Sequence, residues 1–440
     1  MKKLFATIAS MIFCAALYAQ NSPAELSVSL QRAIDLGLQN RFDIQSDKYV
    51  LLRAENEINK SKMEWIPEIA GNGNVRYSPK IQSTFIPAGF FGDDAALVSL
   101  GAKSTSVFGL DLTQTIYKPG ISSDIKIARN QLALEKQKNR QNENLIKERI
   151  AEAYLNVMLR DLQTRIASAD EQRYNEYAQV AEGKLKLGSL LENDYLKAKL
   201  DYENSKVETL KARQNYALAL DNIRYQMNIP AETKLILTDS LSSAATLFDQ
   251  LPVQYTDGSR TEIEQLRLQQ QNNLLQISKS RQNALPTVSF YANYSQQFQY
   301  NNFDYSLGKW WSPFNYLGLR LSIPITANFK NSSTVRAQQL SSSQTDLLLK
   351  QKIADVDFEI KRSRSELGNA LQNMNTAKNN YDLSRVIYEN QKQQYNLGAL
   401  LYSDLLDTDR SLNTTEQNYV KAVYDYLVAS INFQKAIGNY

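Results

Sequence analysis

Two glycine-centred segments of the sequence are each followed by an aspartate at the same spacing. Asp194 lies six residues after Gly188, and Asp404 lies six residues after Gly398. Asp407 comes three residues after Asp404 and therefore shares its face of a helix. Acidic residues favour the first turn of a helix, but six residues after the glycine is late for that preference. We therefore consider these carboxylates as candidates for attracting cations in a polar passage.

Few of the usual catalytic chemistries are open to this chain. It contains no histidine, and its single cysteine, Cys14, lies near the N-terminus. Cys14 lies within the leader that we expect at residues 1–19, so the mature chain would have neither histidine nor cysteine. It would therefore lack the side chains for histidine acid–base catalysis, thiol chemistry and the usual zinc sites. No Gly-x-x-x-x-Gly-Lys phosphate loop is present either. The many carboxylates leave carboxylate catalysis open, but most fit solvated helix faces, so we expect no enzyme, no metal site and no cofactor.

The two turn segments belong to an internal repeat. Residues 185–196 match residues 395–406, so the two copies are offset by 210 residues, as from 185 to 395. Upstream, Trp65-Ile66-Pro67 recurs as Ala284-Leu285-Pro286, and each of these segments opens an alternating stretch. Two copies of one structural unit would explain the length of 440 residues.

Long helices must position the turns. The chain has only 16 glycines and 10 prolines, and few helix breakers indicate long elements. Residues 121–187 contain no proline, so they predict a helix of roughly 100 Å that packs as a coiled coil. The helices expected in the two copies cover residues 26–64, 121–187 and 189–227, then 261–284, 332–397 and 400–437.

Four stretches alternate apolar and polar residues with the period of a β-strand. They cover about residues 68–77, 107–117, 287–300 and 316–325. In the third, Val288, Phe290 and Ala292 alternate with Thr287 and Ser289. About 10 residues suit a tilted strand that crosses a bilayer. Alternation also occurs in soluble sheets, but those need a partner layer, and the flanking helices are long and polar. Because lipid does not tolerate an open sheet edge, four strands would cross it only in an oligomer.

The N-terminus predicts a secretory leader. Lys2 and Lys3 precede an apolar core at residues 4–17, and Ala19 is the small residue before the expected cleavage. Whether Cys14 is ever lipidated stays open, although its apolar neighbours disfavour it. The rest of the chain has no apolar run of about 20 residues, so we expect no transmembrane helix. The formal charge of +4 and the lack of a basic cluster give no indication of nucleic acid binding.

The order, duplication and spacing of these motifs resemble the TolC-type outer-membrane efflux proteins over nearly the whole mature chain. Three elements carry the resemblance: the opening segment at residues 30–41, the Trp65-Ile66-Pro67 strand entry, and both Leu-Gly-x-Leu-Leu-x-x-Asp turns. Each short motif is weak alone, and their combination is specific.

The resemblance implies a mixed α and β membrane fold and a homotrimer. Each protomer would add four strands to one transmembrane β-barrel in the outer membrane of a Gram-negative cell. The long helices would form a coiled-coil barrel across the periplasm. The implied function is a passive duct of a tripartite efflux or type I secretion system. Its partners would be outer-membrane lipid, a periplasmic adaptor protein and an inner-membrane pump of the resistance-nodulation-division, ATP-binding-cassette or major-facilitator type.

The resemblance also implies a periplasmic gate at the helical tips. Family residues at the positions of Asp404 and Asp407 form carboxylate rings at the constriction. Asp194 and Tyr395 match positions that hydrogen-bond between neighbouring helices and keep this end closed. Leu400 stands where the best-known member has an arginine, so a link through that cation cannot form here.

The tip turns themselves are expected either to hold the closed end by apolar contact or to contact the adaptor. The residues assigned to this docking surface are Leu187, Gly188, Ser189, Leu190, Leu397, Gly398, Ala399 and Leu400.

We divide the chain into a leader (1–19), a first repeat (20–230), a connector (231–259) and a second repeat (260–440). The alternative to a duct is a periplasmic coiled-coil adaptor or structural protein without a pore, which the four strands disfavour. The cargo stays open between drugs, metals, proteins and polysaccharide, and the pump partner and the state of the gate stay open as well.

Overall fold

The computed structural model describes residues 25–90, 93–239 and 260–439. The expected leader at 1–19 and residues 240–259 of the expected connector lie outside them. Among the described helices, none is both long and apolar enough to cross a membrane. In chain order the elements are β1 (Glu25–Val28), α2 (Leu30–Asn40), α3 (Phe42–Met63), β2 (Glu68–Tyr77), β3 (Ser83–Ile86), β4 (Ala96–Ser99), β5 (Ser104–Tyr117), α4 (Gly120–Lys186), α5 (Glu192–Met227), β6 (Lys234–Leu237), α7 (Thr261–Gln282), β7 (Thr287–Tyr300), η1 (Gly308–Trp310), β8 (Trp311–Ser322), α8 (Ala327–Asn396) and α9 (Tyr402–Ala436).

The expectation of a single helix over 26–64 is wrong in two places. Residues 25–28 form β1, which pairs in parallel with β6 in the expected connector. The helix is also interrupted at Arg41, which has an extended backbone. There the guanidinium contacts the Asp43 carboxylate at 2.7 Å and the Gln226 backbone carbonyl at 3.2 Å. These partners stabilise a break that helical periodicity does not encode.

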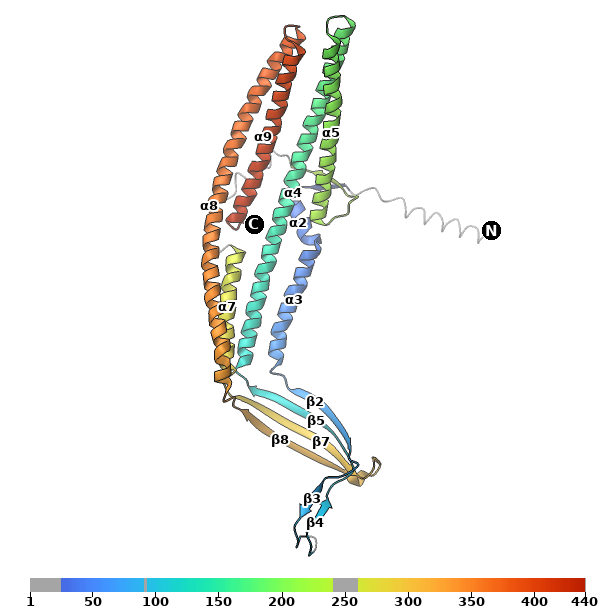
Figure 1. Cartoon of the computed structure of the whole chain (residues 1–440), viewed down its shortest axis with the longest axis vertical. Coiled ribbons are helices and arrows are strands. Elements are labelled where there is room, and N and C mark those ends of the chain that lie inside the picture. The colour runs from blue at the N-terminus through green and yellow to red at the C-terminus, as the bar shows by residue number, and fades with distance from the viewer. Residues whose placement is uncertain (1–24, 91–92, 240–259, 440) are drawn as a thin grey trace, which may run out of the picture. The chain divides into compact units, whose positions relative to one another are not determined.

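Four of the strands form one antiparallel sheet in the order β2-β5-β7-β8, as Figure 1 shows. The register places Ile69, Leu112, Ala292 and Leu317 in one row across all four strands. The next row holds Ala70, Asp111, Asn293 and Tyr316. Because successive strand residues point to opposite faces, one face of the sheet is apolar and the other is largely polar.

Two strand ends differ from the sequence expectation. Strand β5 begins at Ser104 rather than near residue 107. Its first residues pair with the C-terminal end of β7, where Ser104 lies opposite Tyr300. Strand β8 covers Trp311–Ser322 rather than 316–325. Pro324 lacks the N–H that a ladder needs, and its carbonyl accepts from Ala327 at the start of α8, so the strand ends early. Pro313 is tolerated inside β8 because β8 is an edge strand.

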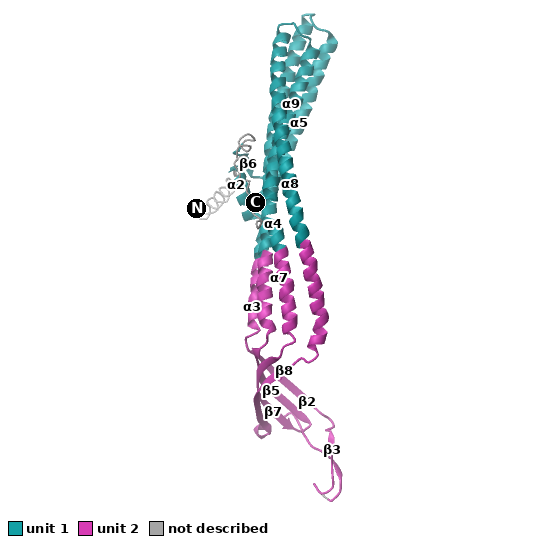
Figure 2. Cartoon of the chain, turned by 90° about the vertical axis from the view of Figure 1, so that its left-hand side faces the viewer, with its two compact units in different colours: residues 1–49, 136–265, 349–440 teal, residues 50–135, 266–348 magenta. Residues whose placement is uncertain are grey.

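The described chain forms two compact units, coloured separately in Figure 2. Unit 1 comprises residues 1–49, 136–265 and 349–440, and unit 2 comprises residues 50–135 and 266–348. Both sequence repeats contribute segments to both units. The compact units therefore cut across the repeats, and the division into two repeats remains a proposal about how the chain is organised.

The main core of unit 1 lies where α4 packs against α2, α5 and α9. Tyr154, at the centre of this core, is almost fully buried. Its hydroxyl lies within hydrogen-bond distance of two acceptors, the Val28 backbone carbonyl at 3.0 Å and the Asp239 carboxylate at 2.9 Å. A Cβ at Gly37 would lie only 2.1 Å from the Ile150 side chain, so glycine is what lets α2 approach α4. This core anchors the hairpins that carry the candidate site.

Candidate functional site: the hairpin tips and a buried polar cluster

The two helical hairpins of unit 1 end in the same backbone motif. The N–H of Gly188 bonds to the Leu185 carbonyl at 2.9 Å, and the N–H of Ser189 bonds to the Lys184 carbonyl at 2.9 Å. The second turn repeats both bonds from Gly398 and Ala399, at 3.0 and 2.9 Å. The turn glycines have φ of 69° and 77°, a left-handed conformation that glycine adopts without a steric penalty.

The leucines of the tips fall into two groups. Leu190 and Leu400 are half-buried against the nearby apolar cluster of the hairpins. Four leucines next to them are 70–85% exposed: Leu187, Leu191, Leu397 and Leu401. Leu191 and Leu401 had not been singled out from the sequence, although they follow the half-buried leucines directly. The tips therefore offer a small exposed apolar surface that belongs to both hairpins.

The three candidate aspartates lie at the surface of the chain or near it. The Asp407 side chain is 79% exposed, and its nearest cation is Arg410, 3.9 Å away. The Asp194 carboxylate lies 3.7 Å from Lys197. Asp404 is exposed and accepts from the Ser403 hydroxyl at 3.4 Å. Within the described residues, no hydrogen bond or ion pair joins two of the four candidate gate residues.

Asp194 and Asp404 are not late in their helices, contrary to the expectation from their spacing. Helix α5 begins at Glu192 and α9 begins at Tyr402, so both aspartates lie in a first helical turn. The residues between each turn glycine and the next helix are not helical. An aspartate six residues after the glycine therefore still lies at the start of that helix. The helix dipole therefore favours acidic residues at these two positions, whereas Asp407 lies beyond the first turn.

Tyr395 is buried among the aromatic side chains near the hairpin tips. Its side chain is 4% exposed and packs against Tyr402, with ring centroids 6.2 Å apart. The Lys184 ammonium lies 4.1 Å from the Tyr395 ring centre, close enough for a cation–π contact. Burial raises the pKa of the Tyr395 hydroxyl, which has no hydrogen-bond partner among the described residues.

A buried polar cluster behind the tips was not expected from the sequence. It comprises Asp170 and Arg173 on α4 together with Asp409 and Asn413 on α9. Arg173 Nε donates to Asp409 Oδ1 at 3.1 Å, and the same guanidinium contacts Asp170. The Asn413 amide donates to the other oxygen of Asp170. Asp409 is 0% exposed, so this cluster lies within the helical packing.

The cluster holds more negative than positive charge. Burial of Asp170, together with the nearby Asp409 and Glu416 carboxylates, raises its pKa to about 6 against the opposing attraction of Arg173. Burial and the charge of Asp409 also raise the pKa of Tyr174. One turn further along, the hydroxyls of Tyr177 and Tyr388 lie 2.6 Å apart. The cluster can therefore take up a proton near neutral pH.

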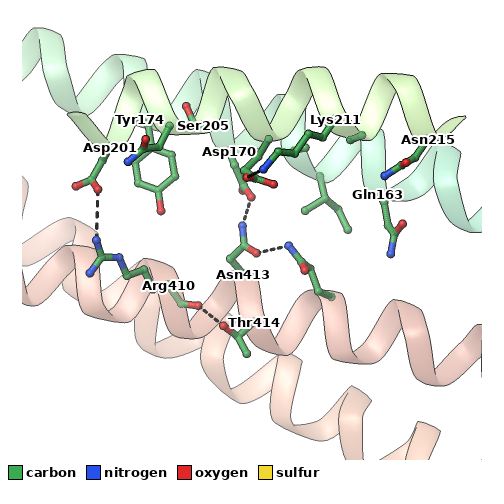
Figure 3. Close-up of a pocket in the computed structure, with 16 residues that line it drawn as sticks. Gln163, Asp170, Tyr174, Asp201, Ser205, Lys211, Asn215, Arg410, Asn413 and Thr414 are labelled. Carbon is green, nitrogen blue, oxygen red and sulfur yellow. Dashed lines mark hydrogen bonds and ion pairs between the residues drawn. The ribbon is translucent and has the colours of Figure 1, made fainter. Parts of the chain in front are cut away.

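A polar groove of about 680 Å³ opens beside the cluster between α4, α5 and α9. Figure 3 shows Arg410 reaching Asp201 across it, at 3.3 Å, and Asn413 turned towards Asp170. The Gln417 amide donates to Asn413 at 2.7 Å, which orients the asparagine. A sequence signal for the cluster existed: Asp170, Arg173, Asp409 and Asn413 occupy helix positions next to residues of the apolar seam.

A membrane-length sheet with one apolar face, in a chain that also forms long helical hairpins with apolar tips, defines an outer-membrane duct protein of the helical-hairpin class. The model of the family described as "Outer membrane efflux protein" matches residues 33–228 and 254–439. The chain belongs to this family, which is a family of efflux ducts rather than enzymes. Its location is accordingly the outer membrane, with a large periplasmic portion.

Known proteins similar to the chain agree with this assignment. The alkaline protease secretion protein AprF of Pseudomonas aeruginosa is 19% identical over 320 residues, which cover 69% of this chain and 63% of AprF. The chain thus spans less than two thirds of that relative. The solved structure of CusC has a TM-score of 0.76 at 17% identity, covering 96% of this chain and 95% of CusC.

Two further solved structures have the same fold. CmeC of Campylobacter jejuni has a TM-score of 0.73 at 14% identity, and the match covers 93% of this chain and 85% of CmeC. VceC of Vibrio cholerae has a TM-score of 0.71 at 13% identity, and the match covers 93% of this chain and 96% of VceC. The mixed α and β fold class expected from the sequence is confirmed.

Proposed function

We propose that three copies of this chain form a passive duct that exports substrates across the periplasm and the outer membrane. The observation that carries the proposal is the register of the sheet. Its apolar row contains Ile69 and Leu317, which are 66% and 76% exposed in the single chain. Its edge strands, β2 and β8, have no further strand partner in the described chain. Lipid accepts such a sheet only when its edges are paired, and edges from other copies can pair them.

The helices support the same assembly. Helix α5 exposes five apolar side chains that fall on one of its faces: Leu196, Leu200, Val207, Leu210 and Leu218. Each is at least half exposed in the single chain. A narrow apolar stripe on a long helix is typical of a coiled-coil seam, and a neighbouring copy would cover it. The number three comes from the resemblance to the family.

The exposed tip leucines are proposed to contact a periplasmic adaptor. Leu187, Leu191, Leu397 and Leu401 supply the apolar contact area, while Leu190 and Leu400 hold the turns against their own hairpins. The adaptor in turn would link the duct to an inner-membrane pump. The name of AprF refers to protease secretion, which keeps protein among the possible cargoes beside small molecules.

Asp404 and Asp407 are proposed to form carboxylate rings at the periplasmic end, with Asp194 and Tyr395 closing the gate between helices. The exposure of Asp407 supports a position facing a passage rather than a core. We propose no catalytic step for this chain: transport through the duct would depend on the pump for its energy.

A cysteine crosslinking experiment tests the assembly. The mature chain expected from the sequence has no cysteine, so any disulfide that forms must join the two introduced cysteines. Val75→Cys on β2, which lies on the same face of the sheet as Ile69 and Leu317, is combined in turn with Asn315→Cys, Leu317→Cys and Leu319→Cys on β8. We expect oxidation to produce covalent species of two and three chains. Matched pairs on the central strands, such as Leu110→Cys with Tyr294→Cys, should crosslink only within one chain. Monomers from every β2–β8 pair in intact membranes would contradict the proposal.

A further inference from the structure

Asp111 occupies the centre of the polar face of the sheet. It lies on β5, an inner strand, and both its carboxylate oxygens accept hydrogen bonds from neighbouring strands. Asn293 on β7 stands directly opposite in the register and donates to Oδ1 at 2.6 Å. Asn72 on β2 donates to Oδ2. Two amides on two different strands therefore fix the plane of one carboxylate.

The surroundings of Asp111 are built to orient these donors. Ser295 is 2% exposed, and its hydroxyl donates to Asn293 Oδ1 at 2.8 Å. That bond turns the amide nitrogen of Asn293 towards Asp111. Ser295 fits because its register partner is Gly109, where a Cβ would lie 2.1 Å from the serine hydroxyl. A continuous series of contacts across two strands therefore links Gly109, Ser295, Asn293 and Asp111.

The charge of Asp111 is not neutralised. Within the part of the chain that the structure describes, Asp111 takes part in no ion pair. The basic residues on the same face are displaced along the strands: Arg320 is paired in register with Ser289, and Arg76 with Thr105. Arg320 lies 5.0 Å from the Tyr291 ring centre instead. Two neutral amides leave the full negative charge in place, and Glu68 adds a second carboxylate further along the same face.

We propose that Asp111 is a charge-selecting residue inside the strand-built part of the duct, separate from the carboxylates at the helical tips. This rests on the proposed function, in which three copies close around the polar face. Each copy then contributes one oriented carboxylate at the same height. Such a ring favours cations and cationic solutes over anions, and it acts where the passage crosses the membrane.

The test measures the cation-to-anion permeability ratio of the full mature protein in a planar bilayer under a NaCl gradient. Low salt is used because the screening length is only about 10 Å at 0.1 M. Asp111→Asn keeps the shape of the side chain and removes its charge. We expect the Na⁺/Cl⁻ permeability ratio to fall at least about twofold, with Glu68 retaining part of the selectivity.

A charge swap provides the matched control. In the double variant Asp111→Asn with Asn293→Asp, the carboxylate moves to the opposite position on β7, and we expect the permeability ratio to return. Asp111→Glu should keep the ratio even if Asp111→Asn assembles poorly. A normal conductance with an unchanged ratio in Asp111→Asn would overturn the inference, and so would a loss that the swap does not restore. Absence of any conductance in the unaltered protein would instead contradict the proposed function.

Discussion

Arg173 on α4 donates to the fully buried carboxylate of Asp409 on α9, with Nε 3.1 Å from Oδ1. The same guanidinium contacts Asp170, so one cation serves two buried carboxylates. Burying charge in helical packing is costly unless each charge is paired and hydrogen-bonded. The hairpins behind the tips therefore contain a polar contact that couples α4 to α9 and that responds to protonation.

The stability of the hairpins should depend on pH through Asp170. Its pKa is raised to about 6 in the folded protein from an ordinary value of 3.8. The folded state therefore keeps this proton while the unfolded state loses it. The stabilisation is fully present below pH 3.8 and is lost as the pH rises to 6.

The variant Asp170→Asn isolates this dependence from the other carboxylates. Each pKa unit corresponds to about 1.4 kcal/mol. We expect the free energy of unfolding of the unaltered protein to fall by about 2–3 kcal/mol relative to Asp170→Asn over this pH range. Denaturant unfolding of the detergent-extracted protein, followed by circular dichroism, measures it. Parallel pH profiles for the two proteins would show that Asp170 does not titrate there.

Removing the shared cation should destabilise the protein strongly. Arg173→Met leaves the buried carboxylates of Asp170 and Asp409 without their shared cation, which costs about 3–5 kcal/mol. Replacing both partners, in Arg173→Met with Asp409→Leu, should cost clearly less because fewer unpaired charges remain. Melting temperatures of the two variants in detergent give the comparison. Equal losses in both would mean that the two residues are not energetically coupled.

The turn glycines should be required for their backbone conformation alone. A Cβ at Gly188 or Gly398 meets no atom within 4 Å, but φ is 69° and 77°. Alanine at either turn should cost about 1–2 kcal/mol from the left-handed backbone. Gly368→Ala, within α8 and equally free of contacts, should instead stabilise by about 0.5–1 kcal/mol. Thermal unfolding of the three variants checks the difference in sign, and a gain at either turn would contradict it.

The carboxylates after the second turn should select cations. We expect Asp404→Ala combined with Asp407→Ala to reduce the cation preference of the duct in a planar bilayer, because a ring of charge is removed. Glu192→Ala is the control for the alternative role, since Glu192 is an acidic first-turn residue in the other hairpin and has no proposed role in the gate. If helix-start stabilisation is the whole effect, the stability losses will be similar and selectivity will not change in either protein.

Periodic features of the sequence were enough to predict most of the fold. Strands β2 and β7 begin and end where the alternation does, at 68–77 and 287–300. The long helices follow from the scarcity of proline and glycine. The break at Arg41 could not be predicted in this way, because it depends on Gln226, which is distant in sequence.

The candidate site was harder to predict than the fold. The two tip turns were identified from the repeated Leu-Gly motif, and their backbone geometry is the same. The pairing of Arg173 with Asp409 was missed because it joins residues of the two different hairpins. Sequence spacing reports which residues share a helix face, but it does not report which faces meet. The first-turn position of Asp404 was also missed, since the length of the non-helical tip was underestimated.

The most direct test of the central claim is a mass determination combined with conductance on the mature protein extracted from outer membranes in detergent. We expect a particle of three chains, each 50.0 kDa before removal of the leader. We also expect discrete conductance steps when these particles enter a planar bilayer. A protein that leaves the envelope without detergent, sediments as a monomer and gives no conductance would contradict the account.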